Sequence, residues 1–382
     1  MSLDLTVGLL CAAAQARLMI LLLRRVTRRL AWLAGFVLFQ ILMGAGYISS
    51  VSHAAARSSH TSFAIFAAVA YSYLLTSSVA VAVYTVFDAF RQHLDAATDP
   101  SRRRALNAAG GALVAAPFAA MGYGSLIERT RFEVRQIDVP MARLPADLDG
   151  LRILHLSDIH LGLFLSEREL ARVIDASREL RPHIAFVTGD FISAAGDPLE
   201  ACIRQLARIK ADAGMFGCLG NHERYARAET QTAVLAAQAG IPILRDRAQL
   251  LRWGNSVLNV AGVDYQRGSS KDRYLRDAQQ LVYPEGFNVL LSHNPDVFPV
   301  AARQGYDLLF SGHTHGGQVT FEILDESINP ARYFTPYIRG LYRLRPDDTS
   351  FAAYVTPGIG TIGIPARIGA PPEISLLTLR KA

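Results

Sequence analysis

The segment LRILHLSDIH, residues 151–160, is an apolar run that ends in polar residues, Asp158 and His160. Four later segments repeat this arrangement: HIAFVTGD (183–190), GMFGCLGNHE (214–223), FNVLLSHNPD (287–296) and YDLLFSGHTH (306–315). Each is typical of a buried strand that leads into a short loop carrying Asp, Asn or His. Helical patterns lie between several of these strands, at 166–180, 198–211 and 228–239.

This succession of apolar strands and helices predicts an α/β layered domain. In open α/β sheets, ligands gather beyond the carboxyl ends of the strands. We therefore expect the polar loops to converge in space, although about 160 residues separate the first loop from the last.

The loops carry residues whose side chains bind metal ions: Asp158, His160, Asp190, Asn221, His222, His293, His313 and His315. Five of the seven histidines after residue 150 are among them. Carboxylate oxygen, amide oxygen and imidazole nitrogen suit divalent Mn, Fe or Zn, of which we favour Mn, rather than a Cys-ligated zinc. The set is too large for one ion, and two ions bridged by one carboxylate would use it.

The stretch SGHTHGGQV, residues 311–319, places two histidines one residue apart among glycines. We expect an extended segment here, in which His313 and His315 point to the same side and reach different ions. Gly312, Gly316 and Gly317 would permit tight turns and a close approach of the backbone.

The blocks D-x-H, GD, GNHE, H and GHxH follow one another in this order over most of residues 151–320. In this the sequence resembles the calcineurin-like metallophosphoesterases. The apolar N-terminal region and the motifs SHNPD and SGHTHGGQV resemble, more narrowly, the branch of transmembrane proteins with a metallophosphoesterase domain. The resemblance implies an αββα sandwich, in which helices flank two mixed β-sheets.

The resemblance also implies a role for each residue of the motifs. One ion would be held by Asp158, His160 and His315, and the other by Asn221, His293 and His313. Asp190 would bridge the two ions. His222 would not be a ligand but would face the substrate phosphate, where it protonates the leaving group or stabilises its charge.

Residues 1–126 contain uncharged or nearly uncharged stretches that are long enough to cross a bilayer. We predict three or four transmembrane helices, at about 5–23, 30–51, 62–87 and 105–125, followed by the metallophosphoesterase domain at 127–382. The first stretch contains Gln15 and Arg17, so an interfacial helix is the alternative to a span.

Arginines fix the expected orientation, because positively charged loops stay in the cytoplasm. Loops 24–29 and 91–104 are rich in arginine, whereas loop 52–61 has only Arg57. The domain at 127–382 is then predicted on the extracytoplasmic side of the cell (inner) membrane. SRRRAL, residues 101–106, is compatible with a twin-arginine export signal and equally with a plain stop-transfer flank.

The excess of positive charge lies beside the apolar segments. Residues 1–150 contain 14 arginines, no lysine and 9 acidic residues, which gives this part a net charge of 14 − 9 = +5. The net charge of the whole chain is +6. A nucleic-acid-binding protein would carry this excess on its folded domain, so we expect a lipid bilayer and no nucleic acid as partner.

Other residues of reactive type are predicted to be structural. His155 alternates with leucines in a strand and should be buried, whereas His183 starts a strand and should be exposed. The three cysteines, Cys11, Cys202 and Cys218, are expected to be buried free thiols. The alternative is a disulfide between Cys202 and Cys218.

The expected activity is hydrolysis of a phosphodiester or pyrophosphate bond by a membrane-anchored enzyme with two metal ions. Arg224 directly follows GNHE and is a possible phosphate contact. The segment 330–345 is aromatic and basic, and the segment 358–368 is apolar and rich in glycine. If both segments lie beside the cleft and face the membrane, they favour a lipid-linked substrate. The alternative is that they only pack locally.

Three other functions stay open at this point. One is hydrolysis of UDP-2,3-diacylglucosamine in lipid A synthesis, which some members of the branch catalyse and which an extracytoplasmic domain would not fit. The second is a phosphomonoesterase that uses the same ions. The third, from another class, is a membrane sensor or transporter whose soluble half only binds ligand; His222 argues against it.

Overall fold

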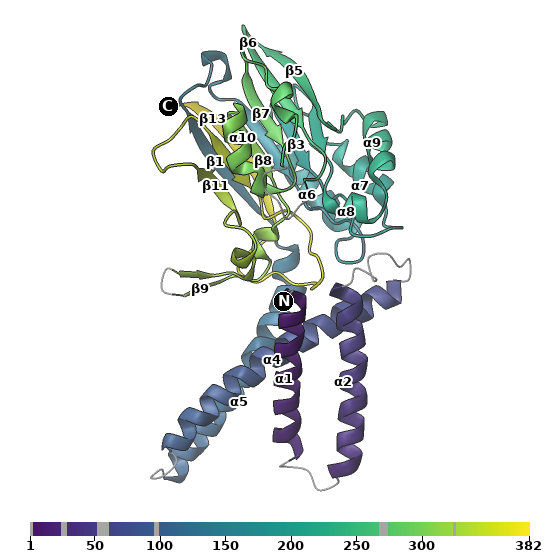
Figure 1. The fold of residues 1–382 in the computed structure, drawn as a ribbon, viewed down its shortest axis with the longest axis vertical. Coiled ribbons are helices and arrows are strands. Elements are labelled where there is room, and N and C mark those ends of the chain that lie inside the picture. Colours follow the sequence, from purple (N-terminus) through teal and green to yellow (C-terminus); the bar gives the residue numbers. More distant parts are fainter. Residues whose placement is uncertain (1–2, 24–28, 52–60, 95–98, 267–273, 324–325) are drawn as a thin grey trace. The chain divides into compact units, whose positions relative to one another are not determined.

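The computed structural model of the chain describes residues 3–23, 29–51, 61–94, 99–266, 274–323 and 326–382 (Figure 1). The chain divides into two compact units, Met1–Ile127 with Gly363–Ala366, and Glu128–Ile362 with Arg367–Ala382.

The first unit consists of long apolar helices: α1 (Leu3–Leu23), α2 (Arg29–Val51), α4 (Thr61–Leu94) and α5 (Pro100–Leu126). Among the described residues, three helical stretches are long and apolar enough to cross a membrane: Trp32–Ser50, Ser62–Gln92 and Pro100–Thr130. The apolar stretch of α1, Leu5–Leu21, is shorter. Residues 24–28, 52–60 and 95–98, on which the predicted orientation depends, lie outside the described residues.

Polar side chains join three of these helices. The Gln15 amide on α1 donates to the hydroxyl of Ser77 on α4 at 2.7 Å. The Gln40 amide on α2 donates to Gln15 Oε1 at 3.1 Å and to the hydroxyl of Tyr73 on α4 at 3.0 Å. In an apolar surrounding these groups have few other partners, so the bonds hold α1, α2 and α4 together.

The second unit contains two mixed β-sheets. The first has five strands in the order β1-β13-β2-β3-β4, and the second has six in the order β11-β12-β8-β7-β6-β5. The strands of the first sheet are β1 (Glu133–Met141), β2 (Arg152–Leu156), β3 (Ile184–Thr188), β4 (Met215–Cys218) and β13 (Glu373–Lys381). Those of the second are β5 (Arg247–Trp253), β6 (Ser256–Gly262), β7 (Phe287–Leu291), β8 (Leu308–Ser311), β11 (Gly340–Arg343) and β12 (Ala352–Val355). A separate hairpin pairs β9 (Phe321–Ile323) with β10 (Glu326–Ile328).

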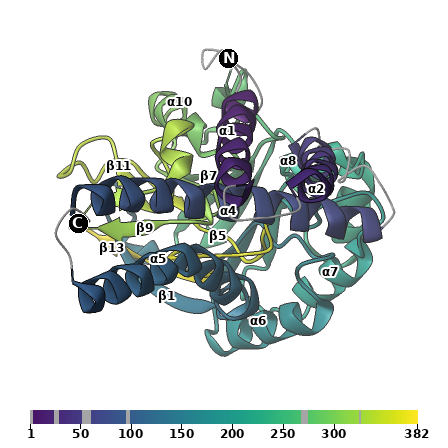
Figure 2. The same cartoon turned by 90° about the horizontal axis from the view of Figure 1, so that it is seen from below.

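The two sheets pack face to face over a buried apolar layer that includes Ile153, Phe186, Phe310 and Leu377. The outer face of the first sheet is covered by helices: α6 (Glu167–Glu179), α7 (Leu199–Leu206) and α9 (Glu229–Gln238). Helix α10 (Phe298–Gln304) packs on the outer face of the second sheet. Figure 2 shows α6 and α7 on one side of the strands and α10 on the other. The predicted αββα sandwich with mixed sheets is confirmed.

Local sequence signals explain several of these elements. Ser166 caps α6, because its hydroxyl accepts from the Glu169 amide at 3.2 Å and the Glu169 carboxylate accepts from the Ser166 amide at 2.7 Å. All three cysteines are buried and free, as expected. His183 is half-buried rather than exposed, because its Nδ1 accepts from the Arg152 amide at 3.0 Å and its ring lies against Trp253.

His155 on β2 is buried between the sheets, as predicted, with its ring against those of Phe310 and Tyr354. Its Nε2 lies 2.9 Å from Thr188 Oγ1. Burial lowers the pKa of His155 to about 3. His155 is therefore neutral in the folded chain at every pH at which the protein is expected to work.

We predict that His155 makes the chain less stable on acidification. The unfolded chain binds a proton at this histidine near pH 6.5, whereas the folded chain does so only near pH 3, so the free energy of unfolding falls as pH drops through this window. A difference of one bound proton between the unfolded and folded chain changes the free energy of unfolding by about 1.4 kcal/mol per pH unit. Thermal unfolding of the detergent-solubilised chain with chelator, between pH 7 and pH 4, should show a shallower loss of stability for His155→Phe. Parallel pH profiles for parent and variant would contradict this reading.

Candidate metal centre

Every predicted site residue follows the carboxyl end of a strand. The five loops carry, in chain order, Asp158 and His160 after β2, Asp190 after β3, Asn221 and His222 after β4, His293 after β7, and His313 and His315 after β8. Strands β2, β3 and β4 are parallel to one another, as are β6, β7 and β8. The two sheets therefore bring their polar strand ends to one place, as the sequence predicts.

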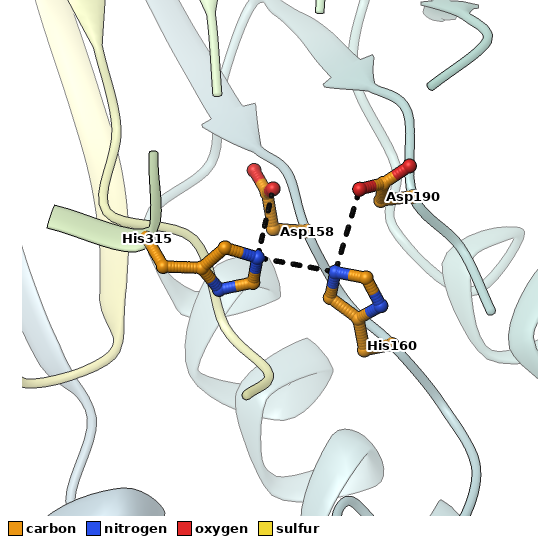
Figure 3. Close-up of side chains that lie close together, drawn as sticks. All are labelled: Asp158, His160, Asp190 and His315. Atoms are coloured by element: carbon orange, nitrogen blue, oxygen red, sulfur yellow. Dashed lines mark hydrogen bonds and ion pairs between the residues drawn. The ribbon is translucent and has the colours of Figure 1, made fainter. Parts of the chain in front are cut away.

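One cluster of ligand atoms comes from Asp158, His160, Asp190 and His315, all buried (Figure 3). The Nε2 atoms of His160 and His315 lie 3.2 Å apart. His160 Nε2 lies 3.4 Å from Asp190 Oδ2, and His315 Nε2 lies 3.4 Å from Asp158 Oδ1. The ligand atoms of this group all lie within 4.8 Å of one another.

A second cluster comprises Asp190, His293 and His313. His293 Nε2 lies 3.1 Å from Asp190 Oδ2 and 3.2 Å from His313 Nδ1. Asp190 thus belongs to both clusters and lies between them. The arrangement gives each cluster its own histidines and one shared carboxylate.

Asn221 is buried, and among the described residues its side-chain oxygen Oδ1 has no hydrogen-bond partner. A buried polar atom without a partner costs about 1–3 kcal/mol, so such an atom calls for a ligand. Nitrogen and oxygen atoms that converge from buried carboxylates, imidazoles and an amide suit divalent Mn, Fe or Zn. The donor set therefore fits two cations.

Five of these residues have a left-handed backbone, with φ between 49° and 73°: Asp158, His160, Asp190, His313 and His315. This conformation is rare outside glycine and costs on the order of 1 kcal/mol or more at each position. Hydrogen bonds between the loops hold it in place. The amide of Asp158 donates to the carbonyl of Gly189 at 3.1 Å, and that of His160 donates to the carbonyl of Asp190 at 3.0 Å.

The expectation of an extended segment at 313–315 is wrong. His313 and His315 have φ values of 73° and 52°, Thr314 is helical, and a 3-10 turn, η7, occupies His315–Gly317. The two side chains nevertheless belong to different clusters, His315 to the first and His313 to the second. The two side chains reach different clusters because the backbone turns sharply at each histidine. The alternation of side chains along an extended strand does not explain their positions.

Two glycines let the carboxylates approach the backbone. A Cβ atom at Gly220 would lie 2.1 Å from Asp190 Oδ1, and one at Gly312 would lie 2.1 Å from Asp158 Oδ2. Any larger residue at either position would displace a carboxylate. This accounts for a glycine directly before Asn221 and another directly before His313.

Glu223 is a buried residue of the site that the sequence did not single out, although it ends the GNHE motif. Its carboxylate accepts from the amides of Asp190 at 2.9 Å, Phe191 at 2.8 Å and Gly220 at 2.8 Å. Burial, and then the charge of Asp190, raise the pKa of Glu223 to about 7. Glu223 thereby holds the loop after β3 against the turn before α8 (Asn221–Tyr225).

Ser193, also missed in the sequence, contacts two of the histidines. Its hydroxyl lies 3.2 Å from His160 Nδ1, and its carbonyl accepts from His222 Nδ1 at 2.7 Å. The bond to the carbonyl places the proton of neutral His222 on Nδ1 and leaves Nε2 for chemistry. His222 also donates its amide to Asp190 Oδ1 at 2.8 Å.

Arg367 is fully buried beneath the site, and nothing in its glycine-rich surroundings predicted this. Its guanidinium donates to the carbonyls of Pro357, Gly358, Gly360, Ala370 and His315. The amide of Gly360 donates in turn to the carbonyl of Asp158 at 2.6 Å. Arg367 therefore ties the loop of Asp158 to the loop of His315. Within the segment 358–368, Gly360 and Arg367 thus pack against the loops of the site.

Electrostatics within the site favour cations. Burial would lower the pKa of His293, but the carboxylates of Asp190 and Asp158 outweigh burial and raise it to about 10. Burial lowers the pKa of His313 to about 3 and that of His222 to about 4. The buried carboxylates thus favour positive charge at the centre, while the neutral imidazole of His313 offers a lone pair.

The second expected flank, residues 330–345, also reaches the site. Phe334 shares a cavity of about 350 Å³ with Tyr265, Asn294, Asp296 and His313. The ring of Tyr265 lies 5.6 Å from that of His313. By contrast, Arg224 lies exposed on α8, and its role as a phosphate contact stays a prediction.

The family model of the calcineurin-like phosphoesterases matches residues 151–317, the stretch that contains all five loops. These residues form a calcineurin-like phosphoesterase domain. The match spans β2 to β8, which belong to both sheets of the sandwich, whereas β1, β11, β12 and β13 lie outside it.

Proteins similar to this chain carry the same kind of domain. The transmembrane proteins with metallophosphoesterase domain of Danio rerio and Bos taurus are 31% and 28% identical, over 65% and 74% of this chain. The chain spans 58% and 65% of the length of these two relatives, less than two thirds in each case. Phosphodiesterase YaeI of Escherichia coli is 28% identical, over 73% of this chain and 99% of the relative.

We predict that Glu223→Gln weakens metal binding. A neutral amide cannot accept from three backbone amides as the carboxylate does, so the Asp190 loop loses its fixed position. Loss of a partner that orients a ligand typically costs about 10–100-fold in metal affinity. Titration calorimetry of the full chain with Mn²⁺ measures this directly. Glu179→Gln, at an exposed position of α6, is the matched control and should bind like the parent. Equal affinities of Glu223→Gln and the parent would rule out this role.

Proposed function

We propose that the chain is a membrane-anchored, metal-dependent phosphoric ester hydrolase that cleaves a phosphodiester or pyrophosphate bond. The observation that carries the proposal is the pair of ligand clusters that share Asp190, within a calcineurin-like phosphoesterase domain. The similarity to a protein named phosphodiesterase supports a diester over a monoester.

We assign the ligands according to the two clusters. One ion is held by Asp158, His160 and His315, and the other by Asn221, His293 and His313, with Asp190 between them. The grouping of the carboxylates and histidines supports this assignment, as does the unpartnered Oδ1 of Asn221. When bound, two divalent cations supply an activated water and neutralise the charge of the phosphoryl oxygens.

His222 is proposed to hold a proton for the leaving oxygen. The carbonyl of Ser193 fixes its Nδ1, so Nε2 is the nitrogen that exchanges protons with the substrate. Burial lowers the pKa of His222 to about 4, and an anionic phosphoryl group beside Nε2 raises it again. Bound substrate therefore favours the protonated form of His222.

The anchor and the side of the membrane belong to the proposal. We propose residues 1–126 as the membrane region and 127–382 as the catalytic domain, in the cell (inner) membrane with the domain outside the cytoplasm. The three apolar helices and the similarity to proteins named transmembrane support the anchor. The arginine pattern supports the orientation. A C-terminal reporter enzyme that is active only in the cytoplasm should be silent; a signal from it would overturn the orientation.

We predict that the loss of activity caused by His222→Ala depends on the leaving group of the substrate. With an alkyl phosphodiester, whose leaving oxygen needs a proton, kcat should fall about 10²–10⁴-fold. With bis-p-nitrophenyl phosphate, whose leaving group is stable as an anion, the loss should be much smaller. The measurement is steady-state hydrolysis with Mn²⁺ by the full chain.

Two further variants complete this experiment. Asp190→Asn should lose activity on both substrates, because the shared ligand is altered. His183→Ala removes a histidine at the opposite end of β3 and should keep both activities. Equal losses of His222→Ala on the two substrates would refute the proton role, and full activity of Asp190→Asn would refute the proposed centre.

A further inference from the structure

Two aromatic side chains beside the site are exposed to an unusual degree. Tyr333 is 88% exposed and Phe334 is 59% exposed, and the preceding Arg332 is exposed as well. They lie on the 3-10 turn η8 (Pro330–Tyr333) and on the residue that follows it. We call Arg332, Tyr333 and Phe334 the aromatic patch. Two adjacent exposed aromatic side chains with a basic neighbour are suited to a partner that is both apolar and anionic.

The aromatic patch is fixed to both halves of the candidate metal centre. Before it, the buried Asn329 accepts from the Ala331 amide at 2.9 Å and donates to the carbonyl of Gly316, next to His315, at 2.9 Å. After it, the hydroxyl of Thr335 donates to Asp296 Oδ1 at 2.6 Å. Asp296 lies in the loop that follows His293. The patch is therefore held in place by contacts on either side of it.

The patch also adjoins the cavity that contains His313. Phe334 lines this cavity together with Tyr265 and Asn294, and yet more than half of the Phe334 side chain is exposed. The same ring is thus part of the cavity wall and part of the outer surface. A molecule that contacts the exposed part of Phe334 is therefore next to the cavity.

We propose that the aromatic patch docks on the surface of the lipid bilayer and presents a lipid-linked phosphate to the metal centre; this rests on the proposed function. The occupant follows from the chain itself, because three helices in its described part are long and apolar enough to cross a membrane. Tyrosine rings favour the bilayer interface, where the ring is in an apolar and the hydroxyl in a wet surrounding. Arg332 complements the negative charge of lipid phosphates.

Fluorescence quenching tests the docking independently of catalysis. Because Cys11, Cys202 and Cys218 are all buried, a dye maleimide labels an introduced surface cysteine selectively. Tyr333→Cys would be labelled in the full chain, in nanodiscs of phosphatidylcholine and phosphatidylglycerol with nitroxide-labelled lipid. Leu250→Cys is the matched control, because Leu250 is also exposed, at 50%. Leu250 lies on β5, and β5 forms the edge of the second sheet opposite β11, the strand that follows the patch in the chain.

The dye at position 333 should shift its emission to shorter wavelength and lose intensity in the nitroxide discs, while the dye at 250 should do neither. Equal quenching at both positions would overturn the proposal. A blue shift at 333 without quenching by the nitroxide lipid would also overturn it, because the patch would then be covered by protein.

Hydrolysis separates the docking from the proposed activity. The double variant Arg332→Gln, Tyr333→Ser should lose about fivefold or more in kcat/KM toward a phosphodiester lipid in the same discs, because one arginine near an anionic surface contributes about that factor. Its hydrolysis of soluble bis-p-nitrophenyl phosphate should match the parent. Equal loss on both substrates, or none on the lipid, contradicts the docking role. A parent chain that hydrolyses neither substrate contradicts the proposed function, and the quenching result then still decides whether the patch contacts lipid.

Discussion

The carboxylate of Asp190 lies between two groups of histidines, and the loops of both sheets are arranged around it. Its Oδ2 is 3.4 Å from His160 and 3.1 Å from His293, while its Oδ1 accepts from the amide of His222. The backbone of Gly220 lies directly against this carboxylate, since a Cβ atom at Gly220 would lie 2.1 Å from Asp190 Oδ1. Because His160 follows a strand of the first sheet and His293 follows a strand of the second, Asp190 contacts loops of both sheets.

Holding this carboxylate in place requires strained backbone at the ligands. The left-handed conformations of Asp158, His160 and Asp190 are each unfavourable, and the buried Asn221 oxygen lacks a partner among the described residues. Two fully buried side chains compensate by binding the backbone: Glu223 accepts from three amides, and Arg367 donates to five carbonyls. Such strain persists where the surrounding structure over-determines it, as is common at functional sites.

The sequence predicts much of the fold and of the site because the decisive signals are local. Each apolar run that ends in Asp158, Asp190 or His313 can be recognised from its own short segment of sequence. Parallel strands then bring these ends together at one edge of the sheet. Strand β13 shows the limit. It lies between β1 and β2 although it is the last strand of the chain, and only tertiary pairing sets that place. The turns at His313 and His315 and the burial of Arg367 likewise depend on contacts between distant segments.

Anomalous diffraction from crystals of the full chain grown with Mn²⁺ tests the central claim most directly. The account predicts two anomalous peaks about 3.5–4 Å apart, with the Asp190 carboxylate between them and Asn221 bound through Oδ1 to the ion of His293 and His313. A single peak at full occupancy, or two peaks of which Asp190 contacts only one, would contradict it.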